Sequence, residues 1–294
     1  MSVPLRSLFA SSVLVLAMAA AAPVQAAPQY SEYVALGDSW SADATLTRIT
    51  TEFVPAGCAQ SASNYPHQVA KALKPTVFKD ATCGAATTEH LYKPQNVLLG
   101  QNPAQFDRLT KNTDLVTMGM GGNDAELAAA VTGCLNLAPP PLGISCKSRW
   151  IQGGVDKMSQ NIADAKVKVA AAIDEIKARS PKAKILIVDY MAGVPEGKGC
   201  YPKLPAWDVD IFWLHDKLAE LATMERTVAQ EKGVTVVDTY HGSEGHDACQ
   251  APGVRWVEGV IPLNPGDSRL IVVPFHPNQL GADWQAKRTL AVIK

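Results

Sequence analysis

The sequence predicts an α/β protein whose central, mostly parallel sheet is covered by helices on both faces. Apolar runs of strand length alternate along the chain with segments of helical periodicity, which is the pattern of βαβ units. No internal repeat, low-complexity tract or interdomain linker interrupts this alternation. With 294 residues and 47% hydrophobic content the chain can bury a sizeable core. We therefore expect one folded domain over residues 27–294.

Five stretches are expected to be strands. The first, residues 33–36, is apolar and runs directly into Gly37-Asp38-Ser39. The clearest, residues 184–190, is apolar through its centre, as a parallel strand buried on both faces should be. The other three are residues 76–80, 115–120 and 234–237.

Four segments are expected to be helices. Residues 158–176 carry apolar side chains in steps of three and four, which marks an amphipathic helix. Residues 65–73 follow Asn64, a suitable N-cap, and have proline in the first turn. The other two helices cover residues 211–228 and the segment after Pro277.

The N-terminus is typical of a secretory signal peptide over residues 1–26. Arg6 is its one charge, residues 8–22 form an apolar run, and Val24-Gln25-Ala26 offers small residues for cleavage. The run is shorter than the ~20 residues that a membrane span needs, which disfavours an anchor. We expect a secreted protein without stable membrane insertion. A net charge of −1 gives no electrostatic basis for a nucleic-acid partner.

Six cysteines in an exported chain indicate three disulfides. The sequence alone leaves their pairing open. Joining neighbours in order is the simplest choice, because each bridge then closes one loop region. This choice pairs Cys58–Cys83, Cys134–Cys146 and Cys200–Cys249. No Cys-x-x-Cys occurs, so a zinc ribbon or a thioredoxin-type redox site is not expected.

Polar residues and glycines follow the ends of three expected strands and precede the last helix. Ser39 follows the first strand, Gly84 the second and Asn123 the third, and His276 stands before the final helix. In a doubly wound sheet such loops converge at one edge. Histidine is the usual base for a serine nucleophile, and backbone N–H groups and an Asn amide can hold an oxyanion.

These four blocks, in this order, resemble those of the GDSL-type (SGNH) hydrolase family. The resemblance spans residues 33–290, and the cysteine-rich loops look like those of secreted actinobacterial esterases and lipases. It implies a flavodoxin-like three-layer α/β/α sandwich around a five-stranded sheet. It also implies that Ser39 attacks a carboxylic ester with His276 as base. The implied oxyanion hole consists of the N–H groups of Ser39 and Gly84 and the Asn123 side chain. No metal or organic cofactor is implied, and we expect a monomer.

One position departs from the family pattern. Members commonly place an acid three residues before the histidine, where this chain has Val273. We therefore expect a Ser39–His276 dyad whose imidazole N–H is held by the backbone carbonyl of Val273, with Asp267 as the alternative acceptor. A second Gly-Asp-Ser ends at Ser268, but no strand leads into it, so we expect a loop serine there.

The sequence leaves two other functions open. One is a carbohydrate esterase that removes acetyl groups from polysaccharide. The other is a catalytically impaired relative that binds lipid or glycan without turnover, which the missing acid would favour and the intact Ser39 and His276 would disfavour. The acyl substrate, lipid or short-chain, does not follow from the sequence.

Overall fold

The computed structural model describes residues 29–261 and 266–293. The expected signal peptide, residues 1–26, lies outside the described residues. The main sheet has five parallel strands in the order β2-β1-β5-β8-β9. Their bounds are Glu32–Gly37 (β1), Val77–Asp80 (β2), Leu115–Gly119 (β5), Lys184–Val188 (β8) and Thr235–Val237 (β9). Four of them lie within stretches that the sequence predicts to be strands, and β1 extends one residue beyond the predicted stretch 33–36 at each end.

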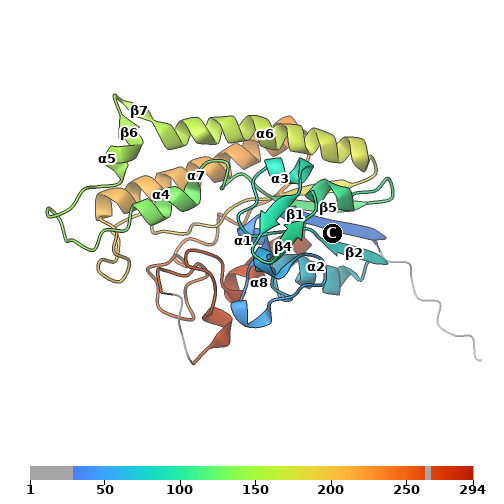
Figure 1. The fold of residues 1–294 in the computed structure, drawn as a ribbon, viewed down its shortest axis with the longest axis horizontal. Coiled ribbons are helices and arrows are strands. Elements are labelled where there is room, and N and C mark those ends of the chain that lie inside the picture. The colour runs from blue at the N-terminus through green and yellow to red at the C-terminus, as the bar shows by residue number, and fades with distance from the viewer. Residues whose placement is uncertain (1–28, 262–265, 294) are drawn as a thin grey trace, which may run out of the picture.

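Helices cover both faces of this sheet (Figure 1). On one face, α6 (Lys157–Arg179) and α7 (Asp208–Glu231) pack against strand residues that include Val34 and Leu36. On the other face, α2 (Tyr65–Leu73) and α8 (Gln279–Ile293) pack against residues that include Tyr33 and Ala35. Successive side chains of β1 therefore enter opposite layers, as strand geometry requires. The expected three-layer α/β/α fold with flavodoxin-like strand order is confirmed.

The four long helices begin and end near the expected positions. Asn64 caps α2, and its side-chain oxygen accepts the backbone N–H of His67 at 3.0 Å. Asp156 caps α6 by accepting the N–H groups of Met158 and Ser159. Each cap gives a partner to N–H groups that the first turn of a helix leaves free.

The short elements do not stand out in the sequence, because they carry too few residues for a readable period. Two antiparallel hairpins are formed by β3 (Gln95–Val97) with β4 (Gly100–Asn102) and by β6 (Ile151–Gln152) with β7 (Val155–Asp156). The short α-helices are α1 (Ser39–Ala42), α3 (Glu89–Tyr92), α4 (Leu127–Gly133) and α5 (Lys147–Trp150). The 3-10 turns are Leu46–Arg48, Ala56–Cys58, Gln105–Arg108 and Ser268–Leu270. Among the described residues, no helix combines the length and apolar character needed to cross a membrane.

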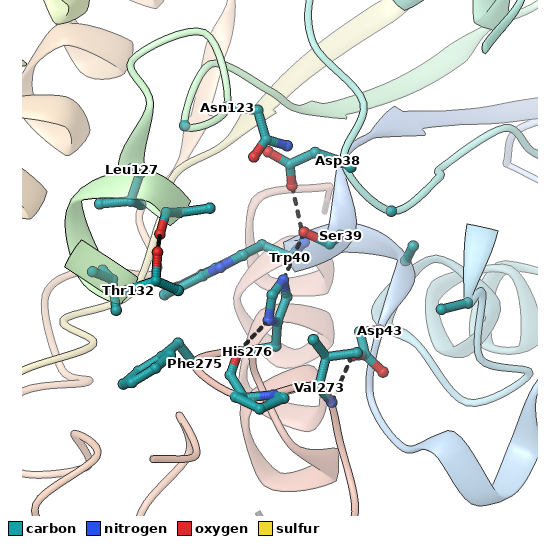
Figure 2. A pocket seen from close by; sticks show the side chains of 18 of the residues that line it. Asp38, Ser39, Trp40, Asp43, Asn123, Leu127, Thr132, Val273, Phe275 and His276 are labelled. Atoms are coloured by element: carbon teal, nitrogen blue, oxygen red, sulfur yellow. Dashed lines mark hydrogen bonds between the residues drawn. The ribbon is translucent and has the colours of Figure 1, made fainter. Parts of the chain in front are cut away.

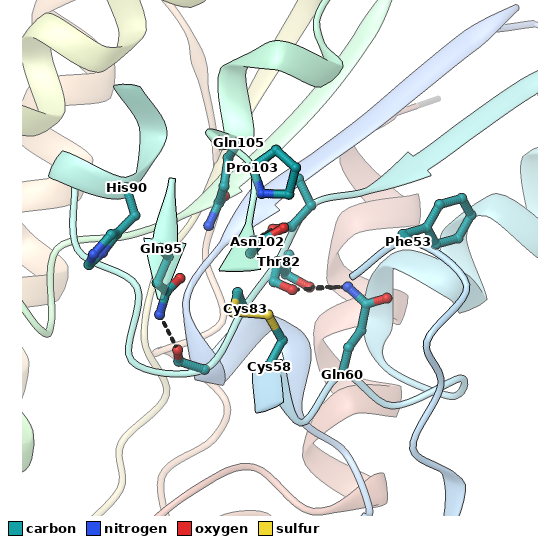
Figure 3. The surroundings of a disulfide bond; sticks show 12 residues. Phe53, Cys58, Gln60, Thr82, Cys83, His90, Gln95, Asn102, Pro103 and Gln105 are labelled. Atoms are coloured by element: carbon teal, nitrogen blue, oxygen red, sulfur yellow. Dashed lines mark hydrogen bonds between the residues drawn. A yellow bond between two sulfur atoms is a disulfide. The ribbon is translucent and has the colours of Figure 1, made fainter. Parts of the chain in front are cut away.

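The six cysteines pair in the expected order, Cys58–Cys83, Cys134–Cys146 and Cys200–Cys249. The first bridge is fully buried beside the end of β2 (Figure 3). Near it the Gln60 side chain donates to the carbonyl of Thr82 at 2.9 Å. The bridge and this hydrogen bond fasten the loop that follows β1 to the loop that follows β2.

Candidate active site

Ser39 is delivered to the carboxyl edge of the sheet by the ends of two neighbouring strands. Gly37 of β1 pairs with Gly119 of β5, and the next N–H, that of Asp38, donates to the Gly119 carbonyl at 3.1 Å. A Cβ on Gly37 or on Gly119 would lie within 2.6 Å of Ser41 Oγ. Glycine at both strand ends therefore leaves room for the Ser41 side chain in the first turn of α1.

His276 faces Ser39 across the site, as Figure 2 shows. Its Nε2 lies 2.7 Å from Ser39 Oγ, and its Nδ1 lies 2.8 Å from the carbonyl oxygen of Pro274. A carbonyl oxygen can only accept a hydrogen bond, so Nδ1 carries the proton of the neutral ring. Nε2 is then free to accept the serine hydroxyl proton.

The carbonyl that holds the imidazole differs from the one expected. The Val273 carbonyl accepts the backbone N–H of His276 at 3.2 Å, and the carbonyl nearest to Nδ1 is that of Pro274. Phe275, between Pro274 and the histidine, has a φ of 61° and reverses the chain there. Positive φ is rare for an aromatic residue and occurs mostly where the surroundings enforce it. The alternative acceptor, Asp267, instead pairs with the Arg269 guanidinium at 2.6 Å.

Partial burial lowers the pKa of His276 below the ordinary value of 6.5, because it disfavours the charged imidazolium. The carbonyls of Pro274 and Val273 act in the opposite direction and raise this pKa, and that of Pro274 accepts the ring N–H. A carbonyl orients the ring as a carboxylate would, but it carries no full negative charge. The ring is thus held in the neutral form that a base requires.

Of the three expected oxyanion donors, the N–H of Gly84 is not available as predicted. Gly84 lines the site, but its N–H donates to the Cys58 carbonyl at 2.8 Å and is not free for a ligand. A Cβ on Gly84 would lie 3.0 Å from that same carbonyl oxygen. The glycine therefore serves the close approach of the disulfide-linked loop.

The residue after Gly84 offers the free donor that Gly84 lacks. Ala85 is exposed in the site and has a φ of 59°. Within the described part of the chain, the N–H groups of Ala85 and Ser39 make no hydrogen bond. The Asn123 amide donates to the Ala86 carbonyl at 2.9 Å, and its second N–H remains available.

A buried hydrogen-bond network that the sequence analysis missed joins the nucleophile turn to the Asn123 loop. The Tyr190 hydroxyl donates to the Asp38 carboxylate and accepts the N–H of Gly122 at 2.9 Å. The other oxygen of Asp38 accepts the N–H of Trp40 at 2.9 Å. Burial raises the pKa of Asp38 to about 7, against the opposing effect of these hydrogen bonds. No local pattern marks Tyr190, which is 152 residues from Asp38.

A second missed residue, Asp43, joins the segment before His276 to the C-terminal end of α1. Its carboxylate accepts the N–H of Val273 at 3.3 Å and that of Ala44 at 2.9 Å. Burial raises the pKa of Asp43 to about 7, and both hydrogen bonds oppose this shift. Asp43 thus acts on the backbone three residues before His276, where the sequence lacks an acid.

Ser39 and His276 open into a cavity of about 760 Å³. Away from Ser39 and His276 its wall is mostly apolar. Contributions come from α4, from the loop after β8 and from the segment before His276, and Trp40 stands beside the serine. The apolar wall includes Leu127, Val131, Leu135, Val194, Leu218, Val257, Val260 and Phe275.

A serine–histidine pair at the carboxyl edge of a parallel sheet, with N–H donors around it, is the arrangement of a serine hydrolase. Residues 35–284 match the GDSL-like Lipase/Acylhydrolase family. The chain is 37% identical to Lipase 2 of Streptomyces coelicolor over 284 residues, which cover 94% of this chain and 90% of that protein. The chain belongs to this family and is a carboxylic ester hydrolase.

Two solved structures share the fold. The phospholipase A1 of Streptomyces albidoflavus superposes with a TM-score of 0.69 at 20% identity, over 89% of this chain and 99% of that one. The extracellular lipase of Streptomyces rimosus gives a TM-score of 0.66 at 23% identity, over 90% and 98%. At these identities the likeness concerns the fold alone.

Proposed function

We propose that this protein is a serine esterase or lipase that cleaves fatty-acyl esters through an acyl-enzyme on Ser39. The observation that carries the proposal is the 2.7 Å contact between Ser39 Oγ and His276 Nε2 at the end of an apolar cavity. The nucleophile has a base, the base has a fixed tautomer, and the acyl chain has an apolar compartment.

In the proposed first step, Ser39 Oγ attacks the ester carbonyl carbon while its proton passes to His276 Nε2. The negative oxygen of the tetrahedral intermediate accepts hydrogen bonds from the N–H groups of Ser39 and Ala85 and from the Asn123 amide. When the intermediate collapses, the C–O bond of the ester breaks and the leaving alcohol takes the proton from Nε2. Water then repeats these steps on the acyl-enzyme and releases the carboxylic acid.

Ala85 rather than Gly84 is proposed as an oxyanion donor because its backbone N–H has no hydrogen-bond partner among the residues that the structure describes. Gly84 would have to give up its 2.8 Å hydrogen bond to Cys58 in order to bind an oxyanion. The N–H of Ala85 loses nothing when it does so, and the positive φ of Ala85 costs an L-residue free energy that a functional orientation would explain.

The cavity favours a fatty-acyl chain over an acetyl group. An acetyl ester would leave most of the 760 Å³ empty and its apolar wall without contact. A longer chain removes that wall from water and gains about 0.8 kcal/mol for each buried CH₂. The size and apolar wall of the cavity therefore disfavour the polysaccharide acetyl esterase, and the intact dyad disfavours a binding protein without turnover.

The test is a panel of p-nitrophenyl esters with acyl chains from acetate to palmitate, given to the wild type and to Ser39→Ala. We expect kcat/KM to rise with chain length beyond acetate and to vanish in Ser39→Ala. Turnover confined to acetate would support the carbohydrate esterase. Binding of lipid or glycan without serine-dependent turnover of any ester would support the binding protein.

We also propose that the protein is secreted. The N-terminal pattern and the three disulfides support export. A structural neighbour, the Streptomyces rimosus enzyme, is named an extracellular lipase. Expression of the full chain in a Gram-positive host should release a protein whose N-terminal sequence begins near Ala27. Retention of residues 1–26 in the cell-bound protein would contradict the proposal.

A further inference from the structure

The turn of the hairpin formed by β3 and β4 consists of two exposed leucines. Val97 pairs with Gly100, which leaves Leu98 and Leu99 as the two-residue turn. Their exposed fractions are 77% and 84%. Asn-Gly and Asp-Gly are the usual residues of such turns, because they are polar and tolerate positive φ. Two leucines here add almost nothing to the protein core.

Leu99 also has an unfavourable backbone conformation for its residue type. Its φ is 63°, in the left-handed region that favours glycine and asparagine. No burial of its side chain offsets this cost within the chain. Asparagine would fit the same backbone better. The leucine side chain is therefore better explained by a contact with something outside the folded domain.

The turn is held firmly at the rim of the catalytic cavity. A Cβ on Gly57 would lie 2.2 Å from the Leu98 carbonyl oxygen, so the turn rests directly on the Cys58 loop. At the base of the hairpin the Gln95 side chain donates to the Gly84 carbonyl at 2.7 Å, beside the Cys58–Cys83 bridge (Figure 3). Leu98 itself lines the cavity that contains Ser39. Leu98 is therefore part of the cavity lining, and Leu99 follows it outside that lining.

We propose that Leu98 and Leu99 form a lipid-docking turn, which inserts into the surface of aggregated ester substrate and brings the cavity mouth to it. This inference rests on the proposed function. A lipid surface is favoured over a protein partner because it alone supplies what the adjoining cavity binds, an acyl chain that leaves an apolar phase. A net charge of −1 favours a neutral or zwitterionic surface over an anionic one. Because the turn is already ordered, docking costs little conformational entropy.

The test uses Leu99→Asn, a substitution that suits the left-handed backbone and removes the apolar side chain. Binding to phosphatidylcholine vesicles that contain triolein is measured by sedimentation, with Ser39→Ala in every protein to prevent turnover. Loss of one inserted leucine should weaken vesicle partitioning about tenfold. In the catalytically intact protein, hydrolysis of triolein vesicles should fall in proportion, while kcat/KM on soluble p-nitrophenyl butyrate stays unchanged. The melting temperature should stay equal or rise.

Two matched variants locate the docking surface. Val167→Asn removes an apolar side chain that is 70% exposed on α6 and should leave vesicle binding unchanged. Leu142→Ser removes an exposed leucine from the loop between Cys134 and Cys146 and should also have little effect.

Wild-type vesicle binding by Leu99→Asn would overturn the proposal, and so would an equal loss in Val167→Asn. A loss confined to Leu142→Ser would overturn it as well, by assigning the docking surface to the other loop. Wild-type protein that fails to hydrolyse the soluble butyrate would instead refute the proposed function, which separates the two failures.

Discussion

Replacing Tyr190 by Phe tests whether the network beneath the serine positions the catalytic groups. The change removes one hydroxyl, which donates to the Asp38 carboxylate and accepts the N–H of Gly122. Asp38 precedes Ser39, and Gly122 precedes Asn123. The hydroxyl therefore joins the turn that carries the proposed nucleophile to the loop that carries a proposed oxyanion donor.

The magnitude follows from the two groups left without a partner. A buried donor or acceptor that loses its partner costs about 1–3 kcal/mol, and a charged one costs more. Two such groups should lower the free energy of unfolding by about 2–4 kcal/mol and the melting temperature by about 5–10 °C. A displacement of Asn123 by about 1 Å would lower kcat by up to about 100-fold with little change in KM.

The assay compares kcat, KM and melting temperature on p-nitrophenyl butyrate, well below the melting temperature of every variant. Tyr33→Phe is the matched control. Its hydroxyl is also buried and also hydrogen-bonded, to Thr117 at 2.9 Å, but it packs in the layer of α2 and α8. The control should lose stability with an unchanged kcat. A Tyr190→Phe protein with wild-type kcat, or equal kcat losses in the two variants, would refute the positioning role.

Three further outcomes are expected. On a soluble ester, kcat/KM should fall as pH falls through a midpoint below 6.5. The reason is that burial keeps the His276 ring neutral at pH values where an ordinary histidine is protonated. A midpoint above 6.5 would contradict this expectation. Replacing Cys58 and Cys83 together by Ser should lower the free energy of unfolding by about 3 kcal/mol. It should also reduce kcat, because their bridge supports the loop of the proposed oxyanion donors. Denaturant unfolding measures the first effect and ester kinetics the second, and the absence of either would contradict this expectation. Gly193→Val should reduce turnover of palmitate esters more than that of butyrate esters. A Cβ at position 193 already lies 3.4 Å from Trp40, so the further carbons of valine would enter the cavity. Equal losses across the ester panel would argue against an acyl chain that passes Gly193.

The strands and long helices were predictable because their signals are local and periodic. Buried parallel strands are continuous apolar runs, and α6 shows its inner face in steps of three and four. Ser39, Asn123 and His276 were predictable for a related reason. Each is a reactive residue type placed directly after a strand or before a helix, and parallel strands bring such positions to one edge.

The contacts that complete the site could not be predicted in this way. Which carbonyl holds His276, that of Pro274 or that of Val273, depends on the positive φ of Phe275. Which N–H remains free, that of Gly84 or that of Ala85, depends on the approach of the Cys58 carbonyl. Every residue but proline carries the same N–H and every residue the same carbonyl, so residue type does not distinguish these choices.

The sequence by itself therefore determined the strands and long helices in chain order and the family, and it predicted Ser39 as nucleophile and His276 as base. Only the tertiary structure decided how the His276 ring is oriented, which backbone N–H groups have no partner within the described part of the chain, and that Tyr190 and Asp43 bind the backbone on either side of Ser39. The physical reason is the range of the interactions. Apolar periodicity acts within one element, whereas the hydrogen bond between Asp38 and Tyr190 joins residues 152 positions apart and exists only after the intervening chain has folded.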